Sequence, residues 1–157
     1  MKKQDPILML ERVDYKNIDM FGKHGDIKSL VRMELPFEMF LSWNHEVTVK
    51  SQLVHPYIKD ELEEALNEIH EYYGEEGIAR HRLNEWGGCF NDRYSRSSGR
   101  WSVHAWGLAV DYLPSLGQYG APAITPKVVV DCFEDHGFAW GGWWEYPDGM
   151  HFSAINE

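Results

Sequence analysis

One long amphipathic segment restricts the fold of this chain more than any other feature. It begins at Pro56, a residue suited to the first turn of a helix, and it runs to Tyr73, just before Gly74. Its apolar residues recur every three or four positions and form one stripe: Ile58, Leu62, Ala65, Leu66, Ile69 and Tyr73. This spacing predicts an amphipathic helix that Gly74 caps.

The other predicted elements are shorter. A second helix is expected from about Pro126 to His136, with Thr125 as its N-cap and Gly137 as its end. Strand-like or extended runs cover residues 30–35, 47–54, 80–86, 108–113 and 150–155, and Pro36 is expected to break the first of them. No internal repeat, low-complexity tract or linker is visible, so we expect a single domain over residues 1–157.

Composition narrows the classes of function. A chain of 157 residues with 43% hydrophobic residues can bury a core without disulfide staples. The formal charge of −10 argues against nucleic-acid binding, which favours basic surfaces. Much of this charge lies between Lys59 and Glu76, where eight acidic residues accompany one lysine. We interpret that stretch as a solvated helix face in preference to an acidic docking surface.

The N-terminus and the cysteines bear on the compartment. The apolar run from Ile7 to Leu10 is too short for the core of a signal peptide, and no stretch approaches the roughly 18 apolar residues of a membrane span. Cys89 and Cys132 are too few for a disulfide framework. We therefore expect synthesis in the cytoplasm, without a signal peptide or with an export signal that has been removed.

Two of the eight histidines have neighbours that indicate a metal site. A catalytic zinc takes three protein ligands from histidine and carboxylate side chains and leaves a fourth position for water. His104, Asp111 and His151 would meet that requirement. Asp111 follows an apolar run in which an unpaired carboxylate is costly to bury, and either a metal ion or a nearby arginine would relieve that cost.

The spacing of these residues requires two turns. Seven positions separate His104 from Asp111, so a straight strand would point their side chains to opposite faces, and we expect the backbone to turn at Gly107. Pro147-Asp148-Gly149 is a turn sequence that can bring Asp148 beside His151. A carboxylate beside a catalytic zinc is the usual general base, and an ordinary turn aspartate is the alternative.

These residues together resemble a known family. Ser102-x-His104-x-x-Gly107-x-Ala109-x-Asp111, then Trp-Gly-Gly, then Asp148-x-x-His151-Phe152, is similar to the D-alanyl-D-alanine carboxypeptidase and L-alanyl-D-glutamate endopeptidase family of zinc peptidases. The resemblance covers roughly residues 84–153. It implies an α+β fold with a small antiparallel sheet and flanking helices, of the type shared with the Hedgehog signalling domain.

The resemblance also implies roles for individual residues. His104, Asp111 and His151 correspond to zinc ligands, Asp148 to the base and Ser102 to a supporting residue. Asn91-x-Arg93 resembles the segment with the family's arginine, which holds substrate and stabilises the oxyanion, although Arg96 and Arg100 lie close in sequence.

The substrate implied is a peptidoglycan stem peptide. Asp148-x-x-His151-Phe152 resembles the endopeptidase branch more than the dipeptidase branch, and Ser153 departs from the Glu or Gln common at its position. We expect a monomeric, phage-type endolysin that reaches the cell wall after release, with a D-alanyl-D-alanine carboxypeptidase as the alternative. Two other classes compete: a cysteine peptidase built on Cys89, and a zinc-stabilised binding module, against which an intact Asp148 argues.

Overall fold

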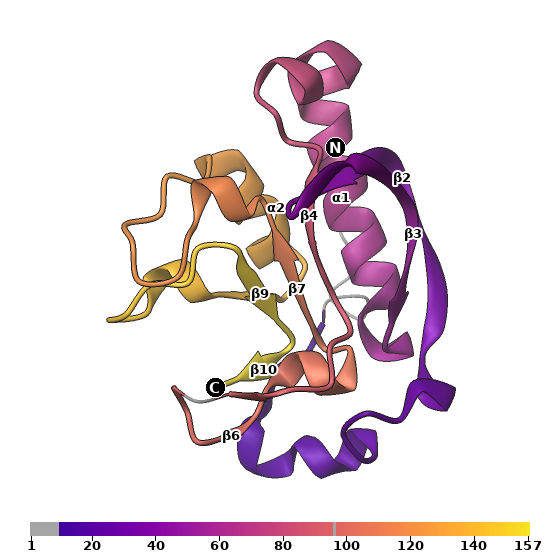
Figure 1. The fold of residues 1–157 in the computed structure, drawn as a ribbon, viewed down its shortest axis with the longest axis vertical. Coiled ribbons are helices and arrows are strands. Elements are labelled where there is room, and N and C mark those ends of the chain that lie inside the picture. The colour runs from indigo at the N-terminus through magenta and orange to yellow at the C-terminus, as the bar shows by residue number, and fades with distance from the viewer. Residues whose placement is uncertain (1–9, 96) are drawn as a thin grey trace.

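The computed structural model describes residues 10–95 and 97–157, and a six-stranded sheet forms its centre. The strands lie in the order β3-β2-β4-β7-β9-β8 (Figure 1). Helix α1 (Pro56–Arg80) packs against β2 and against α2 (Lys127–Asp135), which also contacts β8. None of the helices described has the length and hydropathy needed to cross a membrane.

The strands of the central sheet are β2 (Val31–Leu41), β3 (Asn44–Val54), β4 (Glu85–Gly88), β7 (Ala109–Tyr112), β8 (Ala139–Trp140) and β9 (His151–Ser153). Two small sheets pair β1 (Val13–Asp14) with β10 (Ile155–Asn156) and β5 (Tyr94–Ser95) with β6 (Arg100–Trp101). Short 3-10 helices connect them: η2 (Tyr15–Phe21), η3 (Ile27–Ser29), η4 (Val103–Trp106), η5 (Pro114–Leu116) and η6 (Gly141–Trp143). The α+β class is confirmed. The sheet is mixed, because β2 and β4 pair in parallel while its other pairs are antiparallel.

The long helix forms as its apolar stripe predicts, but it does not end at Gly74. Ile58, Leu62 and Ile69 on the stripe are completely buried. Gly74 takes a positive φ of 68°, which interrupts the helix, and helical backbone then resumes as far as Arg80. Ile78, buried in the core, anchors this added turn. The strand expected at residues 80–86 therefore begins only at Glu85.

Three other boundaries differ from the sequence prediction. Strand β2 continues through Pro36, because a register shift between Glu34 and Met39 leaves the proline outside the regular ladder. Thr125 does not cap α2, since Pro126 occupies the N-cap position and the Thr125 hydroxyl donates to the carbonyl of Gly149. The last strand is divided at Ala154 into β9 and β10.

The register of the central strands sets the place of the site. Val110 pairs with Phe152, and one residue further along Asp111 pairs with His151. Phe152 is fully buried and stacks on Phe133 of α2 with ring centroids 4.0 Å apart. A slip of one residue would turn Phe152 toward the other face of the sheet, so packing against α2 holds Asp111 opposite His151.

Candidate metal centre and active site

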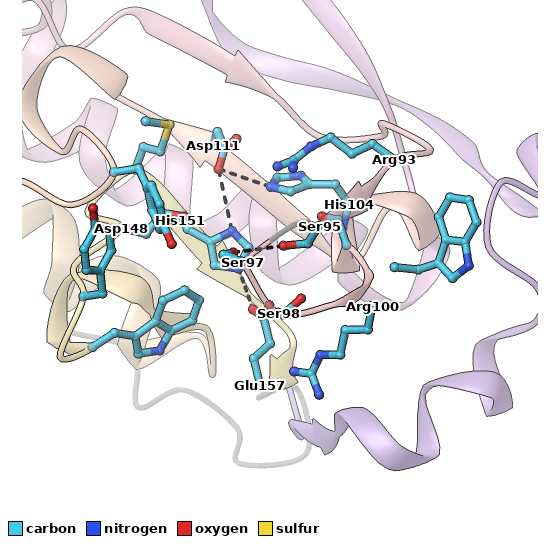
Figure 2. A pocket seen from close by; sticks show the side chains of 16 residues that line it. Arg93, Ser95, Ser97, Ser98, Arg100, His104, Asp111, Asp148, His151 and Glu157 are labelled. Atoms are coloured by element: carbon cyan, nitrogen blue, oxygen red, sulfur yellow. Dashed lines mark hydrogen bonds and ion pairs between the residues drawn. The ribbon is translucent and has the colours of Figure 1, made fainter.

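Three side chains meet at one end of β7 and β9. Potential ligand atoms of His104, Asp111 and His151 all lie within 4.8 Å of one another. Nε2 of His104 is 3.2 Å from Oδ1 of Asp111, and Nδ1 of His151 is 3.7 Å from the same oxygen (Figure 2). Both histidines are buried. The structure thus brings together the three residues that the sequence singles out for a metal.

Local backbone geometry places His104 in this cluster. Ser102 is the N-cap of η4, and its hydroxyl accepts a hydrogen bond of 3.2 Å from the backbone N–H of His104. Gly107 ends η4 in the left-handed conformation, with φ 69°, and the chain then enters β7. The turn expected at Gly107 is confirmed. It directs the side chain of His104, on η4, toward that of Asp111, on β7.

The hydrogen bonds of His104 leave one ring nitrogen for a ligand. Nδ1 lies 2.7 Å from the backbone carbonyl of Cys89, which can only accept, so Nδ1 carries the hydrogen. Nε2 is buried and has no hydrogen-bond partner among the described residues, although the oxygen of Asp111 lies near it. A ring nitrogen that faces a carboxylate across this distance can hold either a proton or a metal ion between the two groups. The residues present therefore fit a metal ion.

The charge of Asp111 suits the same interpretation. Burial opposes its ionisation, but the attraction of His104 and His151 outweighs this effect and holds the pKa of Asp111 well below its usual range. The carboxylate is therefore ionised at neutral pH. A neutral imidazole nitrogen and an ionised carboxylate are both good zinc ligands.

His151 has a carboxylate partner that the sequence analysis missed. Its Nε2 lies 2.5 Å from Oε2 of Glu157, so its Nδ1 faces Asp111. Burial lowers the pKa of His151, but Glu157 and Asp111 outweigh it and the pKa is raised well above the usual value. No motif marks Glu157, which follows His151 by six positions and comes directly after β10.

Asp148 lies beside the cluster, on a turn that closes tightly. Its backbone N–H donates to the carbonyl of Gly141, and its own carbonyl accepts from the N–H of His151. A Cβ at Gly141 would lie 2.5 Å from the carbonyl oxygen of Asp148, which explains the need for glycine there. Burial raises the pKa of the Asp148 carboxyl, and His151 partly opposes the rise.

A cavity of about 600 Å³ opens over these groups. The base expected from the turn, Asp148, lines it together with the three clustered residues and Ser102. Among the tryptophans of the motif region, Trp101 and Trp144 line this cavity, whereas Trp106, Trp140 and Trp143 do not. Hydroxyl side chains that the sequence analysis did not single out also line it: Ser95, Ser97, Ser98, Tyr119 and Tyr146.

The arginines near the site differ in their surroundings. Arg93 lines the cavity, and its backbone carbonyl accepts from the N–H of Ser102. The guanidinium carbon of Arg100 lies over the ring of Tyr15, 3.5 Å from its centroid. Arg96 lies outside the described residues. In Figure 2, Arg93 and Asp148 lie on opposite sides of the histidine and aspartate cluster.

The surroundings of Cys89 argue against a cysteine peptidase. Its backbone carbonyl holds the ring of His104. Its side chain is buried, its thiol donates to the carbonyl of Gly107, and burial raises its pKa well above the usual value. A nucleophilic cysteine requires the opposite, an accessible thiol with a lowered pKa.

Comparison with known families agrees with this site. Residues 95–154 match the family model described as D-alanyl-D-alanine carboxypeptidase, a region that contains His104, Asp111, Asp148 and His151 but neither Arg93 nor Glu157. Comparisons with curated proteins and with solved structures found no match. Peptides of peptidoglycan are the substrates of this family. Over residues 95–154 the chain therefore carries a domain of the D-alanyl-D-alanine carboxypeptidase family of zinc metallopeptidases, with a candidate His-Asp-His metal site.

Proposed function

We propose that this protein is a zinc-dependent endopeptidase that cuts peptidoglycan stem peptides between L-alanine and D-glutamate. The observation that carries the zinc assignment is Nε2 of His104, which is buried, has no hydrogen-bond partner among the described residues and faces Asp111 next to His151. The cavity beside them, with Asp148 in its wall, supplies room for a peptide. The family match supports a peptide substrate derived from peptidoglycan.

The ligands in this proposal are Nε2 of His104, a carboxylate oxygen of Asp111 and Nδ1 of His151. When bound, zinc supplies Lewis-acid chemistry, which acidifies water and polarises a carbonyl group. The hydrogen bonds of His104 to Cys89 and of His151 to Glu157 orient the two rings and fix which nitrogen of each faces the ion.

Asp148 is the proposed general base. A carboxylate oxygen of Asp148 takes the proton of the attacking water and afterwards delivers it to the leaving amine. The raised pKa of Asp148 favours this second step, because the carboxyl holds its proton more firmly than an exposed aspartate would. The role needs no large movement, since Asp148 and His151 line the same cavity.

Arg93 is the proposed partner of the substrate carbonyl. Its guanidinium lies at the cavity wall next to the metal cluster, and it forms no ion pair with another described residue. A fixed cation near the carbonyl oxygen stabilises the negative charge that develops there in the transition state. Ser102 supports the site indirectly, by capping the turn that holds His104.

The choice of bond rests on the similarity of Asp148-x-x-His151-Phe152 to the endopeptidase branch. Ser153, the position that departs from that branch, is fully buried and exchanges hydrogen bonds with the backbone of Ile155, so it forms the bend between β9 and β10. An endopeptidase opens the peptidoglycan mesh, which trimming a terminal D-alanine would not do. We therefore include in the proposal a phage-type endolysin role, in which a monomer acts on the wall after release.

Digestion of purified peptidoglycan tests the proposal. Mass analysis of the fragments is expected to show cleavage between L-alanine and D-glutamate, lost after treatment with a chelator. Elemental analysis is expected to find about one zinc in the purified protein and none in folded His104→Ala or His151→Ala. Release of free D-alanine with the L-alanine to D-glutamate bond intact would indicate a carboxypeptidase. Bound zinc without cleavage of any bond would indicate a binding module.

A further inference from the structure

A second cavity of about 290 Å³ adjoins the metal cluster and is lined by His104 and Asp111 but not by His151. Both cavities are lined by Arg93, His104 and Asp111, so they meet at the proposed metal. We propose that they form one groove across the site, and that the second cavity binds the glycan-linked side of the substrate, the muramyl-L-alanine portion. This inference rests on the proposed function. We call the two parts the Asp148 arm, the larger cavity, and the Trp43 arm, the smaller one.

Two glycines at the end of β4 line the Trp43 arm. Gly87 packs so closely on β7 that a Cβ would lie 2.8 Å from the Cβ of Asp111. Gly88 has a positive φ of 112° and no atom within 4 Å of its Cβ position, so that position faces open space. The pairing of β2 with β4 stops at Trp86, which leaves this edge of β4 without a register partner on the side of β2.

Trp43 forms the outer wall of this arm. It lies in the turn between β2 and β3 and is 69% exposed. Single exposed aromatic residues are common on protein surfaces and need no function. Trp43 is distinguished by its place in a cavity that extends to His104 and Asp111. An exposed indole offers a broad apolar face together with one hydrogen-bond donor, which suits the face of a sugar ring and its hydroxyls.

The charges of the two arms indicate the direction of the substrate. Among the described residues, the Trp43 arm has one ionisable side chain besides the shared Arg93, His104 and Asp111, namely the buried thiol of Cys89. The Asp148 arm adds four serine hydroxyls, the carboxylate of Asp148, and Glu157 hydrogen-bonded to His151. It also adds Arg100, the only arginine among the described residues that lines one arm and not the other. In the stem peptide, D-glutamate has a free carboxylate next to the bond, whereas the lactyl-linked L-alanine and its sugar are uncharged there. The carboxylate therefore fits the Asp148 arm, beside Arg100, and the sugar fits the Trp43 arm.

Binding to zinc-loaded Asp148→Asn protein tests this assignment without turnover. The probes are an L-alanyl-D-glutamyl tripeptide and the same tripeptide with an N-acetylmuramyl group on its L-alanine. Calorimetry is expected to show tighter binding of the muramyl peptide by roughly tenfold, and Trp43→Ala in the same background is expected to remove most of this gain. Trp143→Ala is the matched control, because Trp143 is 71% exposed and lines neither arm, and it is expected to keep the gain.

Equal affinity for the two peptides, or a gain that survives Trp43→Ala, would overturn the inference. So would a Trp43-dependent gain that comes from lengthening the peptide at its carboxyl end, since the direction would then be reversed. Hydrolysis of the sugar-free tripeptide by the unmodified enzyme separates this inference from the proposed function. Cleavage without any muramyl preference would remove only the inference, whereas failure to cleave either peptide would remove the proposed function.

Discussion

Nε2 of His151 lies 2.5 Å from Oε2 of Glu157, and the side chains of the two residues are only 6% and 20% exposed. The contact holds the ring of His151 so that Nδ1 faces Asp111. A hydrogen bond from a ligating histidine to a carboxylate orients the ring and raises its basicity as a ligand.

Removing the charge of Glu157 is therefore expected to weaken metal binding. Glu157→Gln should lower zinc affinity by roughly tenfold and Glu157→Ala by up to about 100-fold, measured by competition with a chromogenic chelator on folded protein. Glu46→Gln, at an exposed position on β3, is the control and should match the unmodified protein. Equal affinity in all four proteins would show that Glu157 does not position His151.

Asp148 is expected to affect turnover and not metal content. Asp148→Asn removes the proton acceptor while keeping the size of the side chain, so kcat should fall by roughly 10²–10⁴-fold. Zinc content should stay at that of the unmodified protein, and Asp135→Asn, exposed on α2, should leave both quantities unchanged. Loss of zinc in Asp148→Asn would require Asp148 and Asp111 to exchange roles.

His136 is expected to make the stability depend on pH. Its side chain is fully buried, with Nδ1 2.7 Å from Glu61 and Nε2 2.8 Å from Glu68, which ties the end of α2 to α1. Burial lowers the pKa of His136, but the two carboxylates outweigh it and raise the pKa above 6.5. Both nitrogens therefore carry hydrogens in the stabilised form.

The sign of the effect follows from that raised value. Because the folded protein binds the His136 proton more tightly than the unfolded chain does, the stabilisation is complete below about pH 6.5 and is lost as the pH rises through the folded-state pKa. Urea titrations should give a lower free energy of unfolding at pH 9 than at pH 6. His136→Gln should reduce this difference, whereas His45→Gln, at a half-exposed position, should keep it.

Replacing Gly107 by alanine is expected to destabilise the fold for two reasons, its left-handed backbone and a steric clash of the added Cβ. A Cβ there would lie 2.9 Å from Cδ2 of Leu30 and 3.0 Å from the backbone nitrogen of His55. Gly107 lies in the left-handed region, with φ 69° and ψ 26°, where an alanine incurs a strain of about 1 kcal/mol. Because the added Cβ would also clash, Gly107→Ala should destabilise the protein by more than this strain alone in thermal unfolding. A loss of only about 1 kcal/mol would mean that Leu30 moves aside without cost.

Several features of this protein follow from the sequence alone, because they depend on residues close together in the chain. The apolar stripe of α1 is local, and so are the turn at Gly107 and the turn that carries Asp148. Each depends on the period of a helix or on the backbone preference of one glycine or proline. The identities of the three clustered residues also depended on short motifs, supported by resemblance to a family.

Long-range packing decided the rest. Pro36 remains within β2 because a register shift accommodates it, which no local preference indicates. The helical turn after Gly74 forms because Ile78 reaches the core. Asp111 faces His151 because stacking of Phe152 on Phe133 selects one register of β7 and β9. Glu157 meets His151, and Trp43 shares a cavity with His104, only after distant segments have packed, since such contacts depend on the whole core and leave no short-range pattern.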